Sequence, residues 1–253
     1  GGTTSAPYSS GTNNTAIGYQ ALKAFTTGGT NVAVGYQSGR LVTEGTNNTL
    51  VGPYAGYDLT TGTGNTLLGS EADGNNVTGT NNTIVGYQAG VGSHGNSHNS
   101  NDFFGYRAGF TITTGNSNVG IGLQALQNIT TGIRNTALGN TAGSLINTGN
   151  YNVLLGYEAG RYGSTRTGAV AIGTQAGLYA TASYNIFVGY GAGLGNSSEP
   201  YSSGGSNVGI GMESQKSFTT GNQNTSVGYE SLRNNTHSYV KDLCITSYLT
   251  EDQ

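Results

Sequence analysis

Apolar and polar positions recur along this chain with a period of 17 residues. Each copy contains the pattern Asn-x-x-apolar-Gly or a close variant of it, and its glycine serves here as the anchor of the repeat. The anchors are Gly18, Gly35, Gly52, Gly69, Gly86, Gly105, Gly122, Gly139, Gly156, Gly173, Gly189, Gly211 and Gly228. Nine of the twelve spacings between them are 17 residues, which indicates tandem copies of one structural unit.

The residues just before each anchor predict a short β-strand. The residue before the anchor is always apolar, and two positions earlier stands Thr, Val or Ile in every copy but the one with Asp102. β-Branched residues in a period of two favour strands, as over residues 15–17. We expect a second short strand in most copies, for example over 23–27 and 127–131. Asn and Gly at the borders supply the corners, because both tolerate positive φ.

Two strands and two corners per 17 residues describe one coil of a flattened β-roll. We therefore predict an all-β fold, a parallel β-solenoid of about thirteen 17-residue coils over residues 11–236. Residues 1–10 form a lead-in, and 237–253 are a cap or a truncated tail. Asn stands four positions before the anchor in every copy except that with Ala169, so we expect a ladder of stacked Asn side chains.

The predicted strand is apolar on both faces. We expect the β-branched residue and the residue before the anchor to point into the coil. The residue between them then points outward, yet it lacks a polar side chain in twelve of thirteen copies and is Phe103 or Phe187 in two. A strand that is apolar on both faces is expected to be covered on both. We therefore predict that identical chains associate side by side.

The amino-acid composition argues against several classes of protein. Charged residues make up 8% of the chain against roughly 25% in typical soluble proteins, but the fixed apolar positions favour an ordered repeat over disorder. Nine Lys and Arg with a net charge of −3 give no basic surface for nucleic acid. No apolar run approaches the roughly 20 residues of a membrane span. The single Cys244 excludes an intrachain disulfide, and a start at Gly1 suggests a piece of a longer protein.

Two segments carry a resemblance to known repeats. Residues 13–22 (Asn-Asn-Thr-Ala-Ile-Gly-Tyr-Gln-Ala-Leu) and 81–90 (Asn-Asn-Thr-Ile-Val-Gly-Tyr-Gln-Ala-Gly) resemble repeats of phage and viral tail-fibre proteins. They are more distantly similar to the head repeats of trimeric autotransporter adhesins. The resemblance covers residues 11–236. It implies a homotrimer of β-rolls that forms the shaft or head of an extracellular appendage, on a virion or a cell, and attaches to surface carbohydrate or a host receptor.

Tyr follows the anchor directly in seven copies. These residues are Tyr19, Tyr36, Tyr87, Tyr106, Tyr157, Tyr190 and Tyr229. A row of Tyr rings can stack against sugars, because each ring has an apolar face and a hydrogen-bonding tip. The same rings can instead fill a seam between chains or shield a corner, and we favour this second role.

The repeat is lengthened at two places, after the fifth and the eleventh anchor, where the spacings are 19 and 22 residues. Insertions in solenoids form surface loops that often carry recognition. The first surrounds His94 and His98, which could bind a metal if Asp102 converged with them, although we expect both to be solvated. The second ends at Tyr201. We take these two His and Tyr201 as candidate binding residues.

The sequence offers little for catalysis. Glu213 and Glu230 lie one coil apart, a spacing compatible with the paired carboxylates of retaining glycosidases. The same position carries Gln in other copies, which favours a solvated row of side chains. The chain contains no Ser-His-Asp, P-loop or zinc pattern, and its three His supply no evident general base. We therefore predict no catalytic residue, no cofactor and no metal.

We predict a structural and adhesive fibre protein, and three alternatives stay open. One is a polysaccharide-degrading tailspike. Another is an ice-binding solenoid, although an inward position for the threonines that suggest it argues against it. These threonines in register are Thr15, Thr49, Thr66, Thr83 and Thr136. The third is architectural, a triple β-spiral in which each repeat extends along the fibre axis instead of coiling around it.

Overall fold

The computed structural model describes residues 9–198, 201–234 and 243–245. The regular elements in these residues are strands of three residues each. The chain divides into two compact units, Gly1–Arg134 and Asn135–Gln253. Residues 1–8 of the expected lead-in, Glu199 and Pro200 of the second insertion, and most of the expected tail lie outside the described residues.

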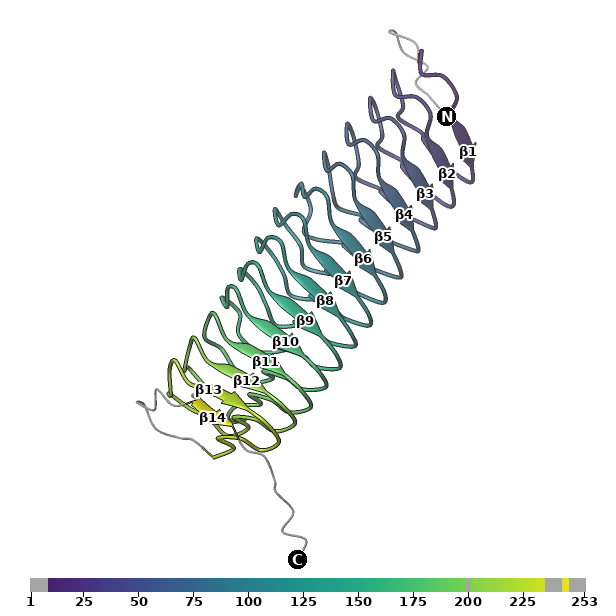
Figure 1. Cartoon of the computed structure of the whole chain (residues 1–253). Helices are drawn as coiled ribbons and strands as arrows, with labels where there is room; N and C mark the ends of the chain where they lie inside the picture. The colour runs from purple at the N-terminus through teal and green to yellow at the C-terminus, as the bar shows by residue number, and fades with distance from the viewer. Residues whose placement is uncertain (1–8, 199–200, 235–242, 246–253) are drawn as a thin grey trace, which may run out of the picture. The chain divides into compact units, whose positions relative to one another are not determined.

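The first unit is a stack of parallel strands. They are β1 (Thr15–Ile17), β2 (Val32–Val34), β3 (Thr49–Val51), β4 (Thr66–Leu68), β5 (Thr83–Val85), β6 (Asp102–Phe104) and β7 (Val119–Ile121). Each strand pairs in parallel with the next, one repeat further along the chain. Figure 1 shows the chain returning to the same side after each strand, so that every repeat makes one coil.

The second unit is built in the same way. Its strands are β8 (Thr136–Leu138), β9 (Val153–Leu155), β10 (Val170–Ile172), β11 (Ile186–Val188), β12 (Val208–Ile210), β13 (Thr225–Val227) and β14 (Leu243–Ile245). They also pair in parallel and in chain order. The predicted parallel β-solenoid is confirmed, and the triple β-spiral is wrong, because equivalent residues of successive repeats pair in register. The tail contributes β14.

Each coil holds one strand rather than the two that we expected. Residues 23–27 and 127–131 form turns and bends. The reason lies in the Thr-Thr-Gly corner, where one carbonyl accepts several N–H groups. The Thr43 carbonyl accepts the N–H of Thr26 at 2.9 Å and of Gly28 at 3.0 Å. A strand needs its N–H and C=O groups to alternate between partners, and this convergence ends the alternation.

The anchor glycines mark the corner after each strand. Gly52 has a φ of +132°, and a Cβ there would lie 2.4 Å from the carbonyl oxygen of Gly69 in the next coil. A Cβ cannot lie this close to a backbone oxygen, and the φ of Gly52 is strained for any residue with an L side chain. The corner therefore accepts only glycine, which explains why the anchor never varies.

The predicted Asn ladder is confirmed within each unit. Asn65 donates through its backbone N–H and through Nδ2 to Oδ1 of Asn48, both at 3.0 Å, and through Nδ2 to the Gly79 carbonyl at 2.9 Å. Its own Oδ1 accepts the same two bonds from Asn82. The ladder side chains are almost all buried. Ala169 still donates its N–H to Asn152 at 3.0 Å but has no amide to continue the ladder.

The strand faces are the reverse of our expectation. From β2 to β13 the central residue is buried and its two neighbours are half-buried or exposed. Phe103 and Phe187, expected on the outside, are fully buried. A period of two says which residues share a face but not which face is inside. The narrow coil decides, because it has room for one central side chain per strand and not for two flanking ones.

Glycines opposite the strand make room for the large central residues. A Cβ on Gly109, four positions after its anchor, would lie 2.4 Å from the Phe103 ring, and one on Gly120 in the next coil would lie 3.0 Å from it. In the next coil the strand centre is Gly120, and the position four after the anchor holds Leu126, which is fully buried. The Phe103 coil and the Gly120 coil thus place their large core residue on opposite walls.

Candidate functional site

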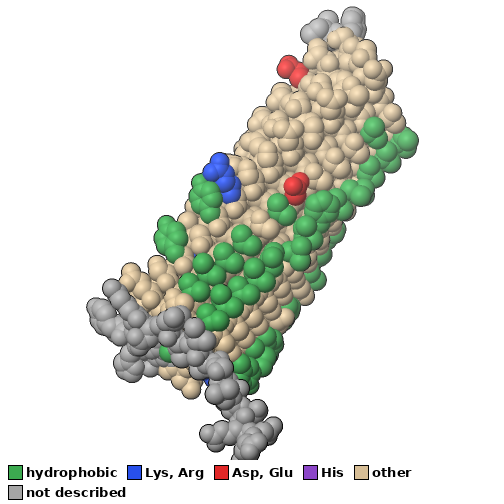
Figure 2. Space-filling view, viewed as in Figure 1, with side chains coloured by type: hydrophobic (Ala, Val, Ile, Leu, Met, Phe, Trp, Pro, Cys, Tyr) green, Lys and Arg blue, Asp and Glu red, His purple; other side chains and the backbone are tan. Residues whose placement is uncertain are grey.

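The outward strand positions form an apolar surface on each unit. Ile17, Leu68 and Leu138, which precede their anchors, are 60%, 46% and 50% exposed. Figure 2 shows hydrophobic side chains gathered over the strands. Among the flanking residues of β1 to β13, Asp102 alone carries a charge. The strands therefore have an apolar outer face, but the residues that form it are those we had placed inside, and its covering by other chains stays a prediction.

The Tyr residues that follow the anchors lie on the surface of each unit. Tyr19, Tyr36, Tyr87, Tyr106, Tyr157, Tyr190 and Tyr229 are all exposed. Rings in consecutive coils stack, with centroids 5.4 Å apart for Tyr19 and Tyr36 and 5.9 Å apart for Tyr87 and Tyr106. The rings stabilise the corner by stacking on one another, and their exposed sides remain available for contact with a partner.

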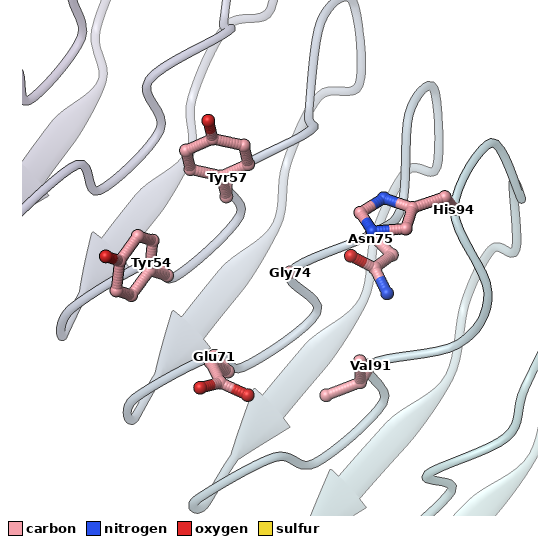
Figure 3. A pocket seen from close by; sticks show the side chains of 7 residues that line it. All are labelled: Tyr54, Tyr57, Glu71, Gly74, Asn75, Val91 and His94. Carbon is pink, nitrogen blue, oxygen red and sulfur yellow. The ribbon is translucent and has the colours of Figure 1, made fainter.

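The first insertion borders a cavity of about 470 Å³ on the first unit. Its lining residues are Tyr54, Tyr57, Glu71, Gly74, Asn75, Val91 and His94. The cavity arises because the position five after the anchor, which holds Arg40, Tyr57 and Val91 in neighbouring coils, holds Gly74 in this one. Figure 3 shows the other lining residues arranged around Gly74. The sequence contained this signal, since a glycine interrupts a row of larger side chains.

Polar side chains at this cavity are held by neighbours. Gln88 donates through Nε2 to Oε2 of Glu71 at 2.8 Å. His94 Nδ1 lies 2.8 Å from Oδ2 of Asp58, and the imidazole is 82% exposed. Asn75 donates through Nδ2 to the Gly92 carbonyl at 3.0 Å.

The two tyrosines of the cavity are also fixed. Arg40 donates to the Tyr57 hydroxyl and lies over its ring, 5.4 Å from the centroid. Desolvation, followed by the neighbouring Tyr36, raises the pKa of Tyr54 above its ordinary value of 10.0. Tyr54 packs edge-on against Tyr36, with ring centroids 5.3 Å apart, and a hydrogen bond joins their side chains.

His98, which we expected to be solvated, is fully buried in the core. Its Nε2 lies 2.9 Å from Oδ1 of Asp73, which is also fully buried. Asn76 donates to the other carboxylate oxygen of Asp73 at 3.0 Å, and Asn101 lies 3.3 Å from Nδ1 of His98. His98 replaces the glycine found seven residues before most anchors, and Asp73 replaces a Gly or Leu. The pair therefore fills core positions and does not reach the surface.

The second insertion borders a cavity of similar size, about 470 Å³, on the second unit. Its lining residues are Leu145, Tyr162, Gly163, Ser164, Thr165, Thr181 and Tyr201. Tyr201 joins two rings of the coils, with centroids 5.0 Å from Tyr162 and 5.8 Å from Tyr179. Both insertions that the repeat spacing singled out thus border a cavity, which their positions in the sequence could not have shown.

The two carboxylates considered for glycoside cleavage are engaged in salt bridges. Glu213 lies 2.6 Å from Nζ of Lys216 and 2.8 Å from Arg233, which is also 3.6 Å from Glu230. The hydrogen bond from Lys216 is the main cause of a lowered pKa at Glu213. A general acid in glycoside cleavage needs a raised pKa instead, so this geometry does not favour that role for Glu213.

Within the described ranges no group of three His, Cys, Asp or Glu could hold a metal ion, and His94, His98 and Asp102 do not converge. The same ranges contain no helix long and apolar enough to cross a membrane. Fold and surface define a parallel β-solenoid protein with an exposed apolar sheet. Comparison with protein-family models, curated proteins and solved structures gives no match for this chain.

Proposed function

We propose that this chain is a structural and adhesive fibre protein, the shaft or head of a homotrimeric viral tail fibre or cell-surface appendage that acts in attachment. The observation that carries the proposal is the apolar, almost uncharged outer face of the sheet in both units. Large exposed apolar surfaces on soluble proteins mark interfaces. The number of three copies rests on the resemblance to tail-fibre repeats, and an extracellular location follows from the same resemblance.

The repeat fold suits this role mechanically. Within each unit parallel backbone hydrogen bonds join successive coils, and the Asn ladder adds to them except at Ala169, so each unit resists bending between coils. Side-by-side copies would cover the strand face, with the Tyr rings at its border filling the seam or shielding the corner, and the two insertions would carry recognition. In solenoid proteins the regular coils commonly form the supporting structure, and the inserted loops carry recognition.

The test is the sedimentation mass of the native particle. We expect about three times the mass of one chain. The variant Leu68→Glu/Leu138→Glu places a charge on the strand face of each unit, and it should sediment as a monomer. Thr148→Glu is the matched control, because Thr148 is exposed at a corner away from the strands. A monomeric native chain, or a trimer unaffected by the double substitution, would contradict the proposal.

One alternative gains support from the structure. Thr15, Thr49 and Thr66, which we had placed inside the coil, are exposed on the flat strand face. Regularly spaced threonines on a flat surface are the arrangement that suggested an ice-binding solenoid. A thermal-hysteresis measurement decides between the two functions, because a fibre whose strand face is covered by its partners should show none.

A further inference from the structure

We propose that the cavity beside the first insertion binds one uncharged hexopyranose unit of a surface glycan. The site comprises Tyr54, Tyr57, Glu71, Asn75 and His94 around Gly74 (Figure 3). The inference deepens the proposed attachment function and rests on it for its biological meaning. Binding of a free sugar can nevertheless be measured whether or not the chain forms a fibre.

The size and floor of the cavity fit such a ligand. A volume of about 470 Å³ lies within the range of small-molecule sites, roughly 300–1,000 Å³. The floor is backbone at Gly74, whose carbonyl accepts the N–H of Asp58 at 2.9 Å. A ligand can therefore approach the main chain without displacing a side chain.

Aromatic side chains supply the apolar contact that a pyranose needs. The Tyr54 and Tyr57 rings are 5.8 Å apart and inclined at 56°, so they form two walls rather than a closed stack. Arg40, in the preceding coil, lies over the Tyr57 ring. Gly74, in the following coil, has no side chain to pack against that ring. The C–H face of a sugar ring can pack on such a wall.

Hydrogen-bonding groups converge from the opposite side. Gln88 occupies Oε2 of Glu71, and in the part of the chain that the structure describes no protein group hydrogen-bonds to Oε1. Oε1 can accept a sugar hydroxyl. The Asn75 amide and the His94 imidazole add further donors or acceptors. A half-buried carboxylate whose position is fixed by a neighbour is a favourable partner for a hydroxyl, because its hydrogen bonds are charge-assisted.

The charge of the lining selects against acidic sugars. Glu71 is the only carboxylate in the lining, and Asp58 nearby lies against His94. The lining contains no Lys or Arg to neutralise a second negative charge. An acidic sugar would therefore be repelled, and an uncharged hexose or N-acetylhexosamine would not.

The experiment uses the full chain and a panel of methyl glycosides of glucose, galactose, mannose, N-acetylglucosamine and N-acetylgalactosamine, with methyl glucuronide as the acidic probe. Saturation-transfer NMR detects binding, and titration gives the dissociation constant. We expect at least one uncharged sugar to bind, with a dissociation constant on the order of millimolar, and the glucuronide to bind more weakly. Failure of all five uncharged sugars, or a preference for the glucuronide, overturns the proposal.

Three variants localise the binding. Glu71→Gln should weaken it about tenfold by removing a charge-assisted hydrogen bond. Tyr57→Ala should weaken it to a similar or greater extent. Gly74→Leu should abolish binding while the chain folds normally, because a Cβ there meets only ordinary contacts of 3.4 Å or more and Leu178 occupies the equivalent position of another coil. Thermal unfolding of Gly74→Leu checks that the fold persists.

Matched controls lie elsewhere on the chain. Glu44→Gln removes an exposed carboxylate from the same unit, and Tyr151→Ala removes an exposed ring from the other unit. Both should bind the sugar as the unaltered chain does. Binding that survives Gly74→Leu, or that falls equally in the controls, places the sugar elsewhere and overturns the proposal. Sedimentation of the same samples reports on assembly separately, so failure of the sugar site and failure of the fibre proposal are distinguishable.

Discussion

The packing of Phe103 against glycines predicts a specific rescue between two destabilising substitutions. Phe103→Ala removes a fully buried ring and should lower the free energy of unfolding by about 3–5 kcal/mol. Gly109→Leu alone should also destabilise, because its Cβ would lie 2.4 Å from that ring and its φ is +62°. Overpacking contributes about 1–3 kcal/mol and the left-handed backbone about 1–2 kcal/mol.

The double variant Phe103→Ala/Gly109→Leu recreates the arrangement seen in the next coil, with a small strand centre and a Leu four positions after the anchor. Leu126 follows the small strand centre Gly120 with a φ of +50°, so a Leu fits this backbone position when the ring is absent. The Leu side chain should fill the space that the ring leaves. We expect the double variant to be more stable than the sum of the single effects predicts, by at least about 2 kcal/mol.

The assay is chemical denaturation followed by circular dichroism, run on the four proteins of the cycle at one protein concentration. Solenoids can unfold in stages, so the comparison uses the transition that the Phe103 substitution shifts. Additive effects of the two substitutions would refute the argument that the Phe103 ring and a side chain at position 109 compete for the same core volume.

Further predictions concern the buried polar residues. Ala169→Asn should restore the interrupted ladder and raise the free energy of unfolding by about 1 kcal/mol, and a lower midpoint of thermal unfolding would contradict this. Asp73→Ala leaves the buried His98 without its charged partner and should lower the free energy of unfolding by about 3–5 kcal/mol. The triple variant Asp73→Gly/Asn76→Leu/His98→Gly introduces the residues that the preceding coil has at these positions. It should recover most of the lost stability in the same denaturation assay. Burial lowers the pKa of Arg166 from 12.5 to about 10, so the unfolded chain holds this proton more tightly and the resulting penalty on folding applies at every pH below about 10. Arg166→Leu removes hydrogen bonds to Gly160 and Ala180, but it should leave the free energy of unfolding at pH 7 unchanged or raise it by about 1–2 kcal/mol. A decrease in the free energy of unfolding above about 2 kcal/mol would show that these hydrogen bonds outweigh the cost of burying the charge.

Local residue types were sufficient to predict the coil and its register. The anchor glycine, the Asn four positions earlier and the β-branched strand residues have roles set by the backbone and by the identical coil above or below. A close approach such as that of Gly52 to Gly69 excludes every side chain, so the requirement is visible in every copy. The ladder followed from the same repetition, because a residue that recurs every 17 positions stacks on itself.

The second strand and the state of His98 could not be predicted in the same way. Residues 127–131 have a suitable composition for a strand, but the Thr130 carbonyl accepts the N–H groups of Thr113, Thr114 and Gly115 at once. That convergence depends on how the neighbouring coil turns. His98 lies in an inserted loop and is nevertheless buried against Asp73, a partner more than twenty positions earlier that only the coiling brings next to it.

The sequence alone determined that this protein is a stack of similar coils, because identical residues at a fixed period can satisfy their backbone only on one another. The tertiary structure decided which strand face is inside, since the two faces share one period and differ only in how they fit a narrow core. Phe103 fits that core because Gly109 and Gly120 leave space for it. The tertiary structure also placed the two insertions beside cavities, since a cavity such as that at Gly74 depends on side chains from three successive coils.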